Sequence, residues 1–76
     1  MAQMSYELPP TNLMIWYNQQ PNRTAALRSI MKRAGVSVTY ATNWVRGLGE
    51  PKKEEHRQAL AQITGIEVDD LFRFAE

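Results

Sequence analysis

The 76-residue chain contains no cysteine and only one histidine, His56. The absence of cysteine excludes a disulfide framework and a thiolate metal site, and a single histidine leaves too few ligands for a conventional zinc centre. We therefore expect no metal and no cofactor. A chain of this size has room for one core, which packing alone must hold together while it buries only about 60% of the unfolded surface.

Long apolar runs are also missing. The longest is Leu13–Tyr17, far short of the roughly 20 residues that a membrane span needs. The N-terminus lacks the basic and apolar blocks of a signal peptide, so we expect a cytoplasmic protein without membrane contact. No repeat and no glycine- or serine-rich linker divides the chain. We expect an extended lead-in over 1–10 and a single domain over 11–76.

The net charge of +1 conceals an uneven distribution along the chain. Residues 23–57 carry eight basic and three acidic side chains, a balance of +5, whereas the remainder carries one basic and five acidic side chains, a balance of −4. A basic middle framed by acidic ends is expected of a domain that presents one face to a polyanion. An unevenly charged, solvated surface would give the same count.

Apolar residues recur at helical spacing in five segments, and none shows the alternation of a β-strand. Prolines and glycines separate the segments. The expected helices are a first over 11–20, a second that begins after Asn22 or Thr24 and ends before Gly35, a third over Ser37–Arg46, a fourth with Pro51 in its first turn that ends at Gly65, and a short fifth around 68–72. The sequence therefore predicts an all-α bundle of five short helices.

Several side chains have a structural interpretation in this bundle. Trp16 and Trp44 are expected to anchor the core, and His56 is expected to pack on the buried stripe of the fourth helix. Asp69 and Asp70 are adjacent in sequence and cannot face one another on a helix, so they are better explained as acids at a helix start than as a catalytic pair.

The residues around Gly35 carry the functional prediction. A helix-turn-helix needs two helices that cross on one apolar seam, with a small residue where the chain reverses. The apolar residues of this seam are Ile30, Ala34, Val36, Ala41 and Trp44. They leave six side chains on the outer side and N-terminal end of the third helix: Val38, Thr39, Tyr40, Thr42, Asn43 and Arg46. Asn, Arg, Thr and Val are residue types that read base edges directly.

The stretch from about Ala26 to Phe72 resembles the Cro/lambda-repressor (XRE-type) helix-turn-helix family. The resemblance rests on Ile-Met-Lys-Arg-Ala-Gly-Val-Ser at 30–37, Thr-Asn-Trp-Val-Arg-Gly at 42–47, Pro51, Leu60, Ile63, Thr-Gly-Ile at 64–66, Val68 and Asp-Asp-Leu-Phe at 69–72. Two positions depart from the pattern. Met31 stands where the family usually has alanine, and Ala41 replaces a β-branched residue; such an exchange can conserve volume at the helix crossing.

The resemblance implies a lambda-repressor-like bundle whose third helix enters the major groove of DNA. Base contacts would come from Val38, Thr39, Thr42 and Asn43. The DNA backbone would be contacted by Arg23, Thr24, Tyr40, Arg46, Lys52 and Lys53. For three of these, simpler interpretations remain: Tyr40 as exposed packing, and Lys52 and Lys53 as a solvated first turn.

The same resemblance implies a Cro-like repressor of phage or prophage origin that occupies an operator and blocks polymerase. Members of the family commonly bind as dimers. Leu71, Phe72 and Phe74 give the C-terminal end more apolar surface than so small a core needs, so we expect a homodimer through it. No sensor domain fits this length, so we expect no small-molecule effector.

Three other functions are alternatives to DNA-binding regulation. An enzyme is disfavoured because no glycine elbow or phosphate-binding loop surrounds Ser5, Ser29 or Ser37. An antitoxin of a toxin–antitoxin pair would use the same fold, with residues 1–10 available to contact the toxin. A protein-interaction module would use the fold without DNA, although the basic face argues against it.

Overall fold

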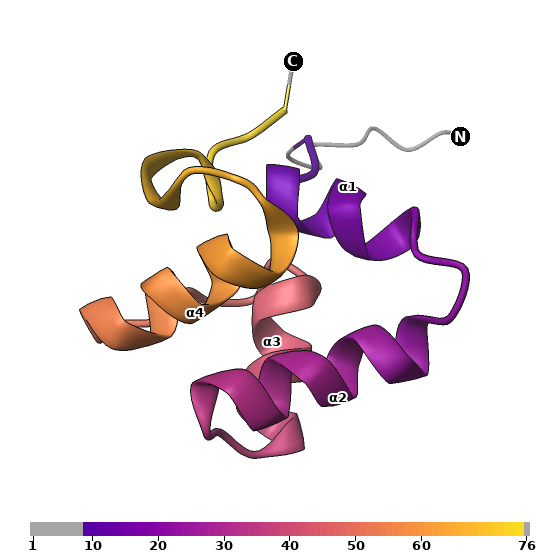
Figure 1. The fold of residues 1–76 in the computed structure, drawn as a ribbon. Helices are drawn as coiled ribbons and strands as arrows, with labels where there is room; N and C mark the ends of the chain where they lie inside the picture. Colours follow the sequence, from indigo (N-terminus) through magenta and orange to yellow (C-terminus); the bar gives the residue numbers. More distant parts are fainter. Residues whose placement is uncertain (1–8, 76) are drawn as a thin grey trace.

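A computed structural model describes residues 9–75 of the chain, which are all-helical and contain no β-strand (Figure 1). The elements are α1 (Asn12–Asn18), α2 (Arg23–Ala34), α3 (Val38–Val45), α4 (Glu54–Thr64) and a single 3₁₀ turn, η1 (Val68–Asp70). The predicted all-helical fold is confirmed, with four α-helices. Most of the lead-in over 1–10, which carries the antitoxin alternative, lies outside the described residues.

Short-range hydrogen bonds fix the starts of the first two helices. The Thr11 hydroxyl accepts the Met14 N–H at 3.2 Å, while the Thr11 N–H donates to the Met14 sulfur at 3.4 Å. Asn22 Oδ1 accepts the Ala25 N–H at 3.0 Å, so Asn22, rather than Thr24, is the N-cap of α2. Both arrangements satisfy N–H groups that have no acceptor within their own helix.

The fourth helix begins three residues later than expected. Pro51 is buried in the preceding loop instead of occupying the first turn. Its carbonyl accepts a hydrogen bond of 2.9 Å from Arg57 Nε, so a side chain takes the place of an intrahelical donor. The first turn carries Glu54 and Glu55, whose charges suit the positive end of the helix dipole.

The C-terminal segment contains only the turn η1 where a fifth helix was expected. Beyond it the chain pairs with the start of α1. The carbonyls of Leu71 and Arg73 accept the N–H groups of Leu13 and Asn12, both at 3.0 Å, and the Asn12 side chain donates to the Asp70 carbonyl at 2.9 Å. An isolated bridge joins Thr11 to Phe74. These bonds tie the C-terminal segment to the start of α1, and they satisfy free N–H groups of that helix.

The core takes side chains from every α-helix. The buried hydrophobic residues are Leu13, Ile30, Ala41, Trp44, Val45, Ala59, Leu60 and Leu71. Trp44 is therefore a core anchor, as predicted, whereas Trp16 is only half-buried. His56 is also half-buried, and its ring centroid lies 5.6 Å from that of Trp44.

The three C-terminal apolar residues differ in exposure. Leu71 is completely buried and Phe72 packs against the core, so Phe74, 49% exposed, is the one aromatic side chain of the three with a large exposed area. The apolar surplus inferred from the sequence belongs mainly to the core. The homodimer through this end stays a prediction, with Phe74 as its exposed apolar side chain.

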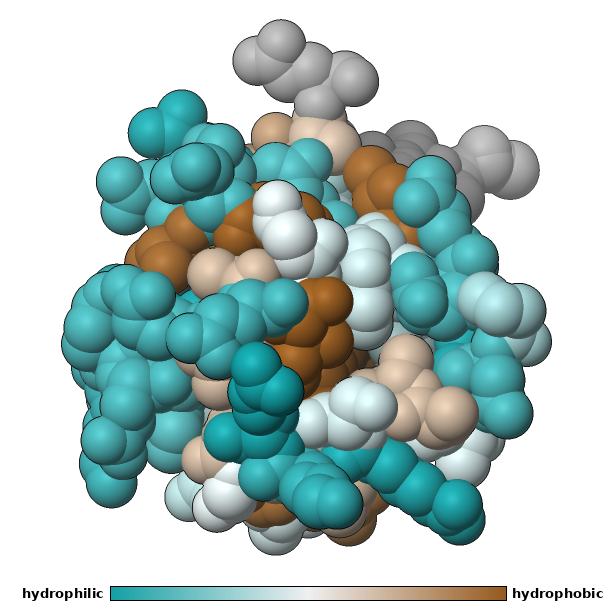
Figure 2. Space-filling view, viewed as in Figure 1, coloured by the Kyte–Doolittle hydropathy of each residue, from teal (hydrophilic) through white to brown (hydrophobic). Residues whose placement is uncertain are grey.

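The face seen in Figures 1 and 2 is polar at its edges and apolar near its middle. A groove is lined by Trp16 of α1, Ala26 of α2 and Ile63 of α4, among others. Across residues 9–75, no helix combines the length and apolar character that a membrane crossing requires.

Replacing Leu71 with alanine should lower the free energy of unfolding by about 2–5 kcal/mol, because it opens a cavity under the pairing with α1. The matched variant Phe74→Ala should cost less than about 1 kcal/mol, since that side chain is half exposed. Urea denaturation followed by circular dichroism measures both. Equal losses would contradict the assignment of Leu71 to the core.

Candidate nucleic-acid interface

Helices α2 and α3 are joined by the three-residue turn Gly35–Ser37 and pack against each other. Gly35 has φ 70° and ψ 39°, the left-handed conformation that glycine adopts without steric cost. The N–H groups of Gly35 and Val36 both donate to the Met31 carbonyl, at 2.8 and 3.1 Å. The chain therefore turns at Gly35, the residue predicted for the turn.

The buried side of α3 determines which of its side chains face outward. Ala41, Trp44 and Val45 are buried. Thr39, Thr42, Asn43 and Arg46 are spaced i, i+3, i+4 and i+7, so they share one side of the helix and its end.

The predicted α3 contacts differ in exposure. Val38 is 49% exposed and Tyr40 61%, and Thr39 and Arg46 are also exposed, whereas Thr42 and Asn43 are half-buried. The N-terminal turn of α3 is thus the most accessible part of the predicted base-contacting set. Ser37 is the N-cap residue, as predicted, but its side chain makes no capping hydrogen bond.

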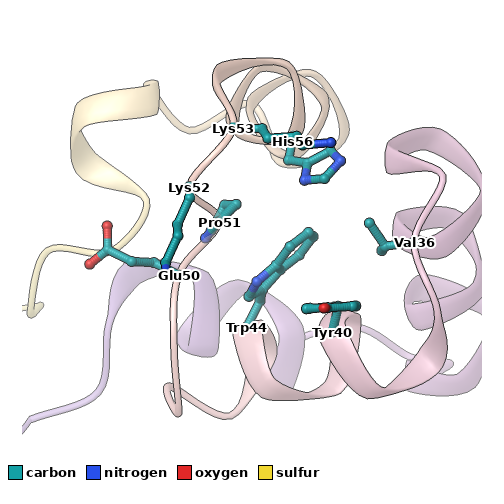
Figure 3. Close-up of a pocket in the computed structure, with 8 residues that line it drawn as sticks. All are labelled: Val36, Tyr40, Trp44, Glu50, Pro51, Lys52, Lys53 and His56. Carbon is teal, nitrogen blue, oxygen red and sulfur yellow. The ribbon is translucent and has the colours of Figure 1, made fainter.

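The predicted backbone contacts fall in two places. Lys52 and Lys53 follow α3 in the loop before α4, are exposed, and line the same pocket as Tyr40 (Figure 3). Arg23 and Thr24 are exposed in the first turn of α2, about 17 Å along the helix from the Gly35 turn. The structure therefore groups Lys52, Lys53 and Tyr40, and leaves Arg23 and Thr24 at the far end of α2.

Two of the eight basic residues in the 23–57 block are engaged within the chain. Arg33 Nη2 donates to Gln62 Oε1 at 2.9 Å, and Arg57 bonds the Pro51 carbonyl and lies 3.7 Å from Glu50. The other six are exposed and form no ion pair or side-chain hydrogen bond within the described part of the chain: Arg23, Arg28, Lys32, Arg46, Lys52 and Lys53. Their charges are available to an external anion.

Sequence reasoning overlooked Leu48. This residue is 68% exposed in the loop after α3, and its N–H donates to the Asn43 carbonyl at 2.8 Å. The available signal was an isolated apolar residue between Gly47 and Gly49. The pocket beside Tyr40 was also overlooked, because its walls come from several elements.

Comparison of the chain with protein-family models, with curated proteins and with solved structures found no match. Among residues 9–75, no group of three or more histidine, aspartate and glutamate side chains is placed to hold a metal ion.

Alanine substitutions at three glycines near α3 should lower the free energy of unfolding by different amounts, in an order set by the local geometry. Gly35→Ala should cost about 1–2 kcal/mol for its positive φ alone, because nothing lies within 4 Å of the added Cβ. Gly47→Ala should cost more, because φ is 76° and the added Cβ would lie 2.6 Å from the Met14 sulfur, which is bonded to the Thr11 N–H.

Gly49→Ala is the matched control. It has neither constraint, and we expect a change within about 0.5 kcal/mol. Chemical denaturation of the three variants measures the order, and a loss at Gly49 as large as that at Gly47 would contradict it.

Proposed function

We propose that the protein is a sequence-specific regulator that binds double-stranded DNA and inserts α3 into the major groove. The main support is one observation: two helices are joined by the turn at Gly35, and the second of them buries Ala41, Trp44 and Val45 while leaving Val38, Thr39, Tyr40 and Arg46 exposed. B-DNA admits an α-helix in its major groove, where each base pair presents a distinct pattern of donors and acceptors.

The chemistry of α3 supports readout of bases. Val38 and the Thr39 methyl group can make apolar contact with a thymine methyl. The Thr39 hydroxyl can donate or accept a hydrogen bond at a base edge, and the Asn43 side chain can form two hydrogen bonds with adenine. Thr42 and Asn43 are half-buried in the protein. In this proposal they contact the bases that lie directly under α3 in the groove. The exposed first turn of α3 makes the deepest contacts.

The unpaired cations support contact with phosphates. Arg46 ends α3, and Lys52 and Lys53 lie in the loop that follows, so these charges flank the proposed reading helix. Arg23 and Thr24 begin α2, where free N–H groups and the helix dipole favour an anion. In this proposal they bind a phosphate further along the duplex.

The resemblance of residues 26–72 to the Cro/lambda-repressor family supports the same function and extends it. By this resemblance the protein is a Cro-like repressor of phage or prophage origin, with a lambda-repressor-like fold, that acts by occupying an operator. In this family each bound copy reads one half-site, and the half-sites lie about one DNA turn apart. The number of half-sites in the operator would therefore give the number of bound copies.

Duplex affinity should fall steeply between 50 and 200 mM salt, and Arg46→Gln should reduce both the affinity and the salt slope by about one counterion. Arg73→Gln is the matched control, because it removes the same charge beside Asp70, away from α3. Fluorescence anisotropy with a labelled duplex measures both. Salt-independent binding, or equal loss in both variants, would refute the proposal.

Thr39→Ala should change the sequence preference at one or two base pairs, with a loss of about 1–3 kcal/mol of discrimination there. Its affinity for unrelated duplexes should stay the same. Selection from a random duplex library measures the preference, with Ser29→Ala on α2 as the control that should select the parental sequence. An unchanged Thr39→Ala selection would show that α3 does not read those bases.

A further inference from the structure

A pocket of about 370 Å³ lies between α3 and the start of α4 (Figure 3). Figure 3 shows the rings of Tyr40, Trp44 and His56 and the side chain of Val36 around one space. Its volume lies near the lower end of the roughly 300–1,000 Å³ of small-molecule sites, which are mostly apolar with a few polar groups.

Two of the three rings are held in place. Trp44 is 4% exposed, and the His56 ring lies 5.6 Å from it at an interplanar angle of 46°. Tyr40, in contrast, is 61% exposed on the outer side of α3. Figure 3 shows Tyr40 and Trp44 side by side on α3, with His56 across from them on α4, an arrangement of rings that suits a planar aromatic group.

The charges at the rim favour an anion. Lys52 and Lys53 line the pocket and make no side-chain hydrogen bond or ion pair within the described residues. Glu50 is the one acidic residue in the lining, and its carboxylate lies 3.7 Å from Arg57. Figure 3 shows that carboxylate directed away from the rings. The two lysine charges are therefore available to a ligand, whereas that of Glu50 is partly neutralised.

We propose that this pocket binds a small planar aromatic anion. The ring of the ligand lies among Tyr40, Trp44 and His56, and its carboxylate or phosphate contacts Lys52 or Lys53. The chain length led us to expect no small-molecule effector, and this proposal differs from that expectation. It needs no additional domain, because the pocket is formed by α3, the segments on either side of it and the start of α4.

Calorimetry and amide NMR on the free protein test the binding directly. The probes are indole-3-acetate and adenosine 5′-monophosphate, which present a carboxylate and a phosphate, with neutral indole and adenosine as parent molecules. Each anion should bind about 2–5-fold more tightly than its parent. The shifts should concentrate at residues 36, 40, 44, 53 and 56. Equal affinity of anion and parent for both pairs, or shifts elsewhere, would overturn the proposal.

Substitutions at exposed positions test the contacts without disturbing the core. Tyr40→Ala should weaken the tighter anion by about 3–10-fold, whereas Phe74→Ala, which removes an exposed aromatic ring beside α1, should leave its affinity unchanged. Lys53→Gln should weaken it by about 2–5-fold, with Lys32→Gln on α2 as the control for lost charge. Equal effects in test and control variants would overturn the proposal.

A second copy of the chain is the alternative occupant. If it filled the pocket, the amide signals of these residues would move with protein concentration in the absence of any probe. That result would overturn the small-molecule proposal. Signals that stay fixed on dilution and move only with the anion would support it.

One consequence rests on the proposed function. Because Tyr40, Lys52 and Lys53 belong to both sites, a saturating anion should release a labelled duplex in parallel with pocket occupancy. A filled pocket with the duplex still bound would show that the sites do not compete. Absence of duplex binding at every salt concentration would remove the proposed function instead, while the binding measurements on the free protein would stand.

Discussion

An eight-residue helix is only marginally stable in water by itself, because nucleation is unfavourable and few hydrogen bonds follow it. Helix α3 therefore depends on the burial of Ala41, Trp44 and Val45 against the rest of the domain. That burial fixes the rotation of α3 about its axis, and so decides which side chains face outward. Any recognition by this protein rests on that constraint, since one short helix carries most of the candidate contacts.

Features set by neighbouring residues could be predicted from the sequence. Gly35 is in the left-handed conformation at the end of α2, Thr11 caps α1, and α3 lies within the predicted range Ser37–Arg46. In each case the determining atoms lie within a few residues along the chain, where capping and turn preferences act. The apolar contact between α2 and α3 belongs to the same class, because its residues lie close to the Gly35 turn on both sides: Ile30, Ala34, Val36, Ala41 and Trp44.

Features set by distant residues could not be predicted. The expected fifth helix is reduced to the 3₁₀ turn η1, and the carbonyls of Leu71 and Arg73 accept hydrogen bonds from Leu13 and Asn12, near the opposite end of the described chain. The start of α4 also differs from the prediction, and there Arg57 bonds back to the Pro51 carbonyl six residues earlier, a contact that helix-start preferences do not include. The candidate site follows the same division. Helical spacing predicts which α3 side chains face outward. The pocket could not be predicted, because Val36, Tyr40 and His56 come from three different elements that only the folded chain brings together.

The backbone pairing between α1 and the C-terminal segment also determines how the domain would respond to force. Ala75 donates to the Pro10 carbonyl at 2.8 Å, and the pairing then proceeds inward toward Leu13 and Leu71. Both ends of the described chain thus leave from the same end of this ladder, on the side away from the α2–α3 turn (Figure 1). Tension between them would open these hydrogen bonds one after another, as in unzipping, beginning with the bond between Ala75 and Pro10.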